Sequence, residues 1–197
     1  MLDLFGVSAQ EIEGSIVASV VPPVLNSFRT AIRKLTGKSC LVVGPGLKTG
    51  LNILIDNPAQ TGADLVAGAV AALREYQPPL IVVDMGTATT ISVLDQNGSL
   101  TSRTALLPGI SLDQPKKAIG RNTIDCMRSG IMLGTASMLD GMIARMEAEL
   151  GVKTTVILTG GIGKFILPLC STQMIYDEDL LIKGLAALYQ ENRRLAE

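Results

Sequence analysis

Residues 80–93 read Leu-Ile-Val-Val-Asp-Met-Gly-Thr-Ala-Thr-Thr-Ile-Ser-Val, and this stretch decides the fold. The leading apolar run predicts a buried strand that ends near Asp84. Gly86 permits a tight turn and a close backbone approach to a ligand, and the β-branched residues from Ile91 predict a second strand. Such a hairpin can cradle a phosphate and hold a cation beside it. An ordinary hairpin, with threonine present for its strand propensity, is an equally weighted alternative.

The composition limits the functions that the chain can serve. Of 197 residues, 47% are hydrophobic and 3% aromatic, which predicts an aliphatic core large enough for one or two domains. The net charge is −1, with no basic block and no aromatic stacking platform, so we expect no nucleic-acid partner. Because no apolar run reaches membrane-spanning length and no signal peptide is visible, we expect a cytoplasmic protein without a membrane partner.

The sequence contains no histidine, which removes several kinds of chemistry at once. Ser-His and Cys-His nucleophile schemes are excluded, and so are metal sites built on histidine. Acid–base chemistry must then come from Asp, Glu, Lys, Tyr or Cys. The three cysteines, Cys40, Cys126 and Cys170, are widely spaced without a C-x-x-C motif, which is typical of reduced thiols.

The first half of the chain predicts an α/β sheet. Residues 16–21 and 40–43 predict strands, and the Pro22-Pro23 pair between them opens a helix. A strand–helix–strand order with a connection of this length implies that the two strands are parallel. The residues 76–79, Tyr-Gln-Pro-Pro, indicate a hinge between two domains.

Asp64 precedes a stretch rich in alanine, residues 65–74, that predicts a buried helix. Two interpretations of its carboxylate stay open. As a helix N-cap it would accept backbone N–H groups and stabilise the end of the helix. As a carboxylate at the mouth of a loop it could take the proton of a substrate hydroxyl. The residues alone favour the capping role.

The second half adds a long helix. Asn122 or Thr123 is expected to cap a helix that runs to Leu150, with a break near Gly130 and Gly134. The methionines of this helix, at positions 127, 132, 138, 142 and 146, are expected to fill the core rather than to form a binding stripe.

A Gly pair follows the next strand. Residues 154–159 predict that strand, and Gly160-Gly161 ends it. A Gly pair at this place lets the backbone approach a nucleotide, although it is also a common strand-to-helix turn. A last helix is expected over residues 180–195.

Together these motifs resemble one family, the type III pantothenate kinases of the actin and sugar-kinase superfamily of ATPases. The resemblance implies an α/β fold of two actin-like (ribonuclease H-like) domains, with mixed sheets flanked by helices and ligands in the cleft between them. We assign residues 1–76 to a truncated N-terminal domain and residues 77–197 to the C-terminal domain. The matching segments are S-V-V-P-P at 19–23, V-G-P-G-L-K-T-G-L-N at 43–52, D-N-P at 56–58, G-A-D at 62–64, D-M-G-T-A-T-T at 84–90, G-R-N-T at 120–123, M-R-S-G-I at 127–131, T-G-G at 159–161 and D-L-L-I-K-G-L at 179–185.

The resemblance also implies a reaction. It is the ATP-dependent phosphorylation of pantothenate to 4'-phosphopantothenate, the first step of coenzyme A biosynthesis. The implied cofactors are ATP, Mg²⁺ and a monovalent cation, K⁺ or NH₄⁺, and the implied assembly is a cytoplasmic homodimer. Phosphoryl transfer relies mainly on positioning and charge stabilisation, so a chain without histidine can carry it out.

Individual residues match the positions of the family motifs. Asp64 matches the general base, and Asp84 matches the ligand of the monovalent cation. Thr123 matches a pantothenate contact at the dimer interface. The pantothenate-binding loop matches Gly62, Ala63, Asp64 and Leu65, and the ATP contacts match Gly86, Thr87, Gly160 and Gly161.

Two segments of the family pattern have no counterpart in this sequence. Because the opening D-x-G-N-T strand, which wraps the ATP phosphates, is absent, we expect weak turnover. After the hairpin, residues 98–100 run directly into residues 101–108, so we expect one sheet strand to be lost and a helix stub to remain. Three explanations stay open: an incomplete record of a longer enzyme, a truncated product without activity, or a catalytically silent relative that dimerises or serves as an accessory protein.

Overall fold

The computed structural model describes residues 2–19, 21–54, 62–86, 88–105, 115, 117–119 and 122–195. The chain divides into two compact units, each made of separate segments of sequence. Unit 1 comprises Met1–Leu51, Asp56–Ala71 and Leu180–Glu197, and unit 2 comprises Asn52–Ile55 and Ala72–Asp179. The domain division at residue 76 stays a prediction. The units differ from it mainly in that the C-terminal helix groups with the N-terminal residues.

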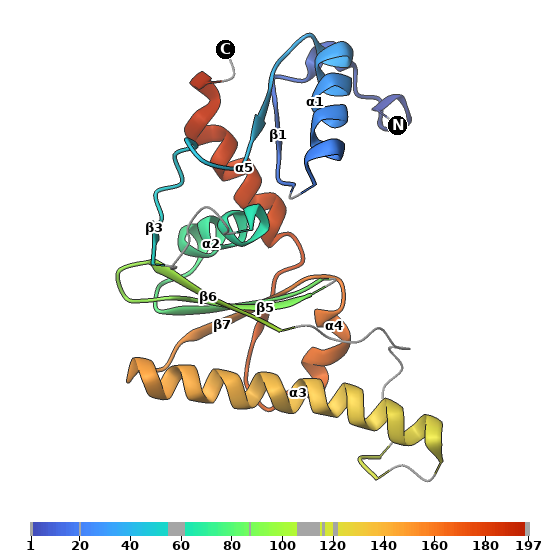
Figure 1. Cartoon of the computed structure of the whole chain (residues 1–197), viewed down its shortest axis with the longest axis vertical. Helices are drawn as coiled ribbons and strands as arrows, with labels where there is room; N and C mark the ends of the chain where they lie inside the picture. Colours follow the sequence, from blue (N-terminus) through green and yellow to red (C-terminus); the bar gives the residue numbers. More distant parts are fainter. Residues whose placement is uncertain are drawn as a thin grey trace. The chain divides into compact units, whose positions relative to one another are not determined.

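Unit 1 contains the predicted strand–helix–strand motif (Figure 1). β1 pairs parallel with β2, from Ser15 opposite Cys40 to Val17 opposite Val42. The proline pair occupies the first turn of α1, where the missing N–H groups cost nothing. The elements of unit 1 are η1 (Leu2–Phe5), η2 (Ala9–Glu11), β1 (Ser15–Val17), α1 (Pro22–Thr36), β2 (Cys40–Val42), most of α2 (Ala63–Glu75), α5 (Leu180–Asn192) and η5 (Arg193–Leu195).

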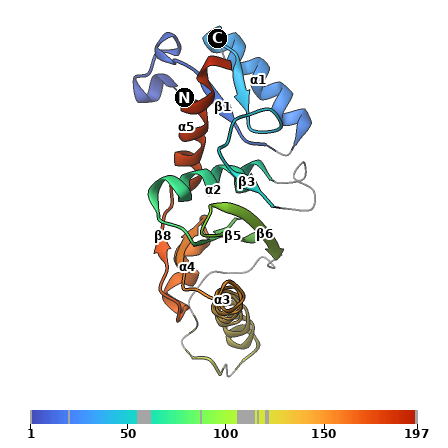
Figure 2. The same cartoon turned by 90° about the vertical axis from the view of Figure 1, so that its left-hand side faces the viewer.

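Helix α5 packs in unit 1 against both β1 and α2, and Figure 2 shows it beside β1. Gly184, which is buried, lies so close to the backbone of Ala67 that a Cβ atom there would overlap the Ala67 carbonyl group. The small residues of α2 make this approach possible, and Ala67 itself is fully buried. The prediction that the alanine-rich helix is buried is therefore confirmed.

Unit 2 is built on a mixed sheet. In the described part of the chain it has six strands in the order β3-β6-β5-β4-β7-β8. β4, β5 and β6 form an antiparallel meander, whereas β7 and β8 are added parallel to β4, and β3 pairs parallel with β6. The strands are β3 (Asn52–Ile53), β4 (Leu80–Met85), β5 (Thr89–Leu94), β6 (Ser99–Ala105), β7 (Thr155–Thr159) and β8 (Ile175–Tyr176).

The expected loss of a sheet strand after the hairpin is wrong. Residues Ser99–Ala105 form β6, which pairs antiparallel with β5 from Leu94 opposite Leu100 to Thr89 opposite Ala105. This segment has no run of apolar residues, and its only leucine, Leu100, is fully buried. Pairing with strands on both sides, rather than hydrophobic pattern, therefore places it in the sheet.

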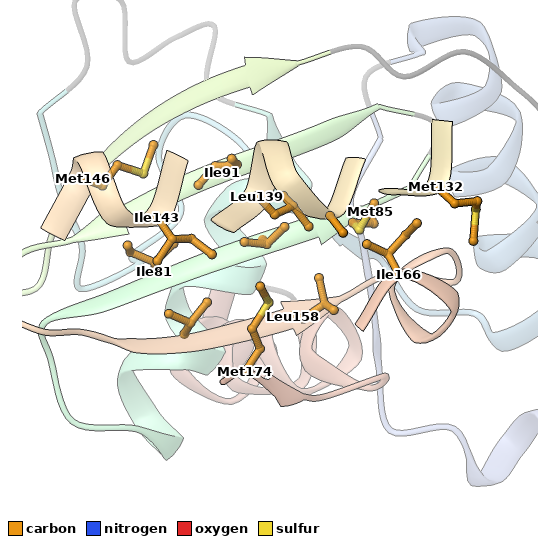
Figure 3. Packing of buried hydrophobic residues seen from close by; sticks show 13 residues of the cluster. Ile81, Met85, Ile91, Met132, Leu139, Ile143, Met146, Leu158, Ile166 and Met174 are labelled. Carbon is orange, nitrogen blue, oxygen red and sulfur yellow. The ribbon is translucent and has the colours of Figure 1, made fainter. Parts of the chain in front are cut away.

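The core of unit 2 lies between the sheet and α3 (Thr123–Leu150), which crosses one face of the sheet (Figure 1). Figure 3 shows the residues that meet there. Helix α3 contributes a stripe at intervals of four and three residues, Met132, Ala136, Leu139, Ile143 and Met146, all at most 8% exposed. The sheet contributes Ile81, Val83 and Met85 from β4, Ile91 from β5, and Val156 and Leu158 from β7.

Helix α3 is continuous over its 28 residues, so the expected break near Gly130 and Gly134 is wrong. Each glycine costs about 1 kcal/mol relative to alanine, and the packed stripe that begins at Met132 outweighs that cost. Asn122 rather than Thr123 is the cap, because its Oδ1 accepts the N–H of Asp125 at 2.9 Å. The prediction that the methionines of this helix fill the core is wrong for Met127, which is 57% exposed near the start of the helix.

The remaining elements of unit 2 are α4 (Gly163–Ile166) and η4 (Leu167–Leu169), which follow β7. Within the described residues, no helix is both long and apolar enough to cross a membrane. A mixed sheet with helices against it confirms the prediction of an α/β fold.

Asp140 of α3 joins the helix to the segment after η4. Its carboxylate accepts the N–H groups of Ser171 and Thr172 at 2.8 and 2.9 Å. Burial raises the pKa of this carboxyl, but the two hydrogen bonds outweigh burial and leave the pKa below its ordinary value. A carboxyl with a lowered pKa in the folded state stabilises the fold above the pKa of the unfolded chain, and this contribution is lost as the pH falls through the folded pKa.

We therefore expect Asp140→Asn to lower the free energy of unfolding by about 1–2 kcal/mol at pH 7. The two N–H groups bond to different carboxylate oxygens. The amide keeps one oxygen as a neutral acceptor, and its NH₂ group cannot accept the other bond. The difference between the wild type and the variant should narrow only as the pH falls through the lowered pKa that Asp140 has in the folded state. Urea titrations at pH 7 and at about pH 2 measure both values. Glu149→Gln, a change on the exposed part of the same helix, should stay within about 0.5 kcal/mol at either pH. A loss that is independent of pH would contradict the role of the charge.

Candidate functional site

The hairpin of residues 80–93 forms as predicted, with β4 and β5 paired from Leu80 opposite Leu94 to Met85 opposite Thr89. Asp84 is the penultimate residue of β4 and is half-buried. Its neighbours across the sheet are Thr90 on one side and Thr159 on the other. The carboxylate therefore emerges where β4 ends between two strands that both carry hydroxyl side chains.

The turn after β7 lies directly against this strand end. At Gly160 a Cβ atom would lie 2.5 Å from the Met85 carbonyl oxygen and 2.8 Å from Oδ1 of Asp84. The same Oδ1 lies 3.8 Å from the Cβ position of Gly86 at the tip of the hairpin. The structure thus brings three of the predicted residues, Asp84, Gly86 and Gly160, to one place. Gly161 follows on the exposed side of the same turn.

Backbone hydrogen bonds hold the glycine turn, residues 160–163. The N–H of Ile162 donates to the Met85 carbonyl at 3.3 Å, which ties the turn to the end of β4. The N–H of Gly163 donates to the Gly160 carbonyl at 3.0 Å and closes the turn. Because α4 begins at Gly163, the turn leads straight into a helix. Gly160 has a φ of 89°, a left-handed conformation that favours glycine.

Sequence reasoning missed Tyr176 of β8. Its hydroxyl donates to the Gly160 carbonyl at 3.2 Å, so the turn is held by β8 as well as by the end of β4. Burial raises the pKa of this phenol, and the Glu178 carboxylate adds to the effect, so the hydroxyl keeps its proton. The contact of Tyr176 with the turn depends on the parallel register that puts Tyr176 opposite Leu158. No sequence pattern shows that register, so the contact could not be predicted.

Asp64 lies in unit 1 at the start of α2. The helix begins at Ala63, so Asp64 lies within the first turn, and the N-cap position predicted for it is wrong by one or two residues. Its Oδ1 accepts the N–H of Leu65 at 2.9 Å, and the side chain is exposed. Ala63 is buried and Leu65 is half-buried, whereas Gly62 lies close to the Asp64 carboxylate. A carboxylate so exposed is accessible to a substrate hydroxyl.

Thr123 is not joined to the group at the end of β4. Thr123 is exposed as the first residue of α3, nine positions before Met132, which packs in the same core as Met85. That separation corresponds to roughly 14 Å along the helix axis. Thr87 lies outside the described residues.

The donor chemistry at the end of β4 suits a hard cation better than a transition metal. The atoms gathered there are carboxylate and carbonyl oxygens from Asp84 and Met85. Oxygen ligands favour alkali and alkaline-earth cations. Among the described residues, no group of three or more Asp, Glu, Cys or His side chains could hold a metal ion by itself. A cation at this place would therefore need further oxygen ligands from a bound small molecule or from solvent.

Fold and site together define an α/β protein with a glycine turn and a carboxylate at the carboxyl end of a central strand, the edge at which open α/β sheets bind their ligands. A family model described as type III pantothenate kinase matches residues 1–145. A curated type III pantothenate kinase from Halalkalibacterium halodurans is 39% identical over 208 aligned positions, which cover 98% of this chain and 82% of the relative. The chain therefore belongs to the type III pantothenate kinase family.

Solved structures share the fold at lower identity. A crystal structure from Campylobacter jejuni, described as a conserved Baf family transcriptional activator, aligns with a TM-score of 0.60 at 19% identity, over 98% of this chain and 89% of that one. A reductive activator for a corrinoid, iron-sulfur protein aligns with a TM-score of 0.53 at 13% identity, over 98% of this chain and 49% of that one. At such identities these two structures inform on the fold alone.

Proposed function

We propose that the chain phosphorylates pantothenate with ATP to give 4'-phosphopantothenate, the first step of coenzyme A biosynthesis. The observation that carries this proposal is the 39% identity to a curated type III pantothenate kinase along 98% of the chain. The glycine turn against Asp84 agrees with it, because phosphoryl transfer depends on backbone that approaches a nucleotide closely.

Asp64 is the proposed general base. It orients the primary hydroxyl of pantothenate and accepts its proton as the phosphoryl group is transferred. Its exposure allows a substrate to reach the carboxylate, and its bond to the Leu65 N–H holds the side chain over the first turn of α2. Gly62, Ala63 and Leu65 are the proposed contacts for the rest of the substrate.

The nucleotide is proposed to lie against the hairpin tip and the glycine turn in unit 2. Gly86 and Thr87 would contact its phosphates, and Gly160 and Gly161 would contact its adenosine. Asp84 and the Met85 carbonyl would hold K⁺ or NH₄⁺, and Mg²⁺ would enter with the ATP phosphates. These cations would neutralise the charge that develops on the transferred phosphoryl group.

A cytoplasmic homodimer with Thr123 at its interface completes the proposal. The alternative function is that of a catalytically silent relative that dimerises or assists another protein. No contact in the described residues favours this alternative, so the experiment that follows decides it.

The direct test is ADP release by the purified chain with ATP, Mg²⁺, K⁺ and pantothenate. We expect ADP release to require pantothenate and to decrease when K⁺ is replaced by Na⁺. The product, identified by mass, should be pantothenate plus one phosphoryl group. A folded chain of the correct mass without pantothenate-dependent turnover would reject the kinase activity and favour the silent relative.

A further inference from the structure

A basic pocket in unit 1 lies at the amino ends of its two strands. Residues 13–14 and 37–39, which precede β1 and β2, form one wall. Tyr189, Arg193 and Arg194, from the carboxyl end of α5 and from η5, form the other. The cavity has a volume of about 680 Å³, within the range of small-molecule sites. In parallel sheets, ligands more often bind at the carboxyl ends of the strands, so this pocket is distinct from such a site.

Positive charge dominates the lining. It carries three cationic side chains, Lys38, Arg193 and Arg194, against one carboxylate, Glu13. The whole chain, in contrast, has a net charge of −1. Across the part of the chain that the structure describes, the guanidinium groups of Arg193 and Arg194 make no ion pair or hydrogen bond. Two guanidinium groups without a partner at one pocket suit the paired oxygens of phosphate groups.

Buried hydrogen bonds fix the backbone that carries these cations. Asn192, only 2% exposed, donates to the carbonyls of Lys48 and Leu188 at 2.7 and 2.9 Å and accepts the Lys48 N–H at 2.8 Å. This clamp joins the end of α5 to the loop of Lys48. A second hollow of about 390 Å³, lined by Lys48 and shared with Arg193 and Arg194, therefore adjoins the first.

The opposite wall is fixed as well. The Nζ of Lys38 donates to the Ile12 carbonyl at 2.7 Å and keeps residues 37–39 against the segment before β1. The Tyr189 hydroxyl lies against Gly14 so closely that a side chain at residue 14 would collide with the phenol ring. Cations near a helix carboxyl end also stabilise the helix dipole. That effect accounts for Arg193 and Arg194, and also for Lys38, which lies two residues past the end of α1, but it does not account for the cavity that the three cations line together.

We propose that this basic pocket binds a small molecule through two or more linked phosphate groups. Arg193 and Arg194 bind the phosphate oxygens, Lys38 supplies a third positive charge, and the Ser39 and Tyr189 hydroxyls donate hydrogen bonds. The proposal does not depend on the kinase activity, because none of these residues belongs to the site proposed for it.

The test is calorimetric titration of the full chain with inorganic pyrophosphate, without Mg²⁺, at low salt. The double variant Arg193→Ala/Arg194→Ala should weaken the affinity at least tenfold. The matched control is Arg33→Ala/Lys34→Ala, which removes the same charge from the last turn of α1 outside the pocket. It should weaken the affinity less than threefold. Arg193→Lys/Arg194→Lys, which keeps the charge but loses the paired geometry, should lie between them.

Two results would overturn the proposal. One is a wild-type chain that shows no saturable binding at pyrophosphate concentrations up to about 1 mM, a weak affinity by any standard. The other is an equal loss in both double-alanine variants, since that would reflect only the general charge of unit 1. A parallel titration with ADP identifies the source of the phosphates: a loss with both probes indicates recognition of the phosphates alone, and a larger loss with ADP indicates a nucleotide.

Discussion

Asp64→Asn is expected to lower kcat for pantothenate phosphorylation by about 10²–10⁴-fold, the range typical of a lost general base. The asparagine Oδ1 can still accept the Leu65 N–H that the Asp64 carboxylate accepts in the structure. The start of α2 should therefore remain intact, and the unfolding free energy should change by less than about 1 kcal/mol. A large loss of turnover with little loss of stability is the pattern that separates a base from a helix cap.

Asp95→Asn is the matched control. The Asp95 carboxylate also accepts backbone N–H groups, from Asn97 and Ser99, each at 2.8 Å, in the turn between β5 and β6. It lies outside every site proposed for the reaction, so kcat should stay within twofold while stability decreases. Steady-state ADP release and thermal unfolding of both variants provide the measurements. Turnover of Asp64→Asn within tenfold of the wild type would reject Asp64 as the base and leave the kinase assignment to other residues.

Local pattern was enough to predict the parts of the site that come from neighbouring residues. The hairpin, with its acid at the end of the first strand, follows from residues 80–93 alone. The turn at Gly160 follows from a Gly pair after an apolar run. That the two meet is known only from the structure, because it depends on the parallel pairing of β4 and β7, which puts Asp84 opposite Thr159.

Features that depend on distant partners could not be predicted. β6 has too few apolar residues to mark it as a strand, and β3 is only two residues long. Tyr176 reaches the Gly160 carbonyl only because β8 pairs with β7. The buried Asn192, which joins α5 to the loop of Lys48, is likewise recognised only in the folded chain, since asparagine near a helix end is normally a surface residue. Sequence patterns show only the local periodicity of each element, whereas these contacts depend on how distant elements are arranged in the fold.

The adjacent glycines of the turn after β7 should respond to alanine in opposite ways. Gly160→Ala would force a left-handed conformation on a residue with a side chain, since φ is 89°. That costs about 1–2 kcal/mol. The new Cβ would also lie 2.5 Å from the Met85 carbonyl oxygen, and relief of such overlap costs about 1–3 kcal/mol more. We expect a loss of roughly 2–5 kcal/mol in the free energy of unfolding, by the sum of these two effects.

Gly161→Ala should change the stability by no more than about 0.5 kcal/mol, because residue 161 is exposed and no atom lies within 4 Å of its Cβ position. Urea unfolding of both variants measures the contrast, and equal losses would contradict the close packing of the turn against β4. The same two variants also distinguish an effect on stability from an effect on nucleotide binding. If the nucleotide lies against this turn, Gly161→Ala should raise the KM for ATP in a chain of unchanged stability, because the added methyl group occupies the exposed side that the nucleotide needs.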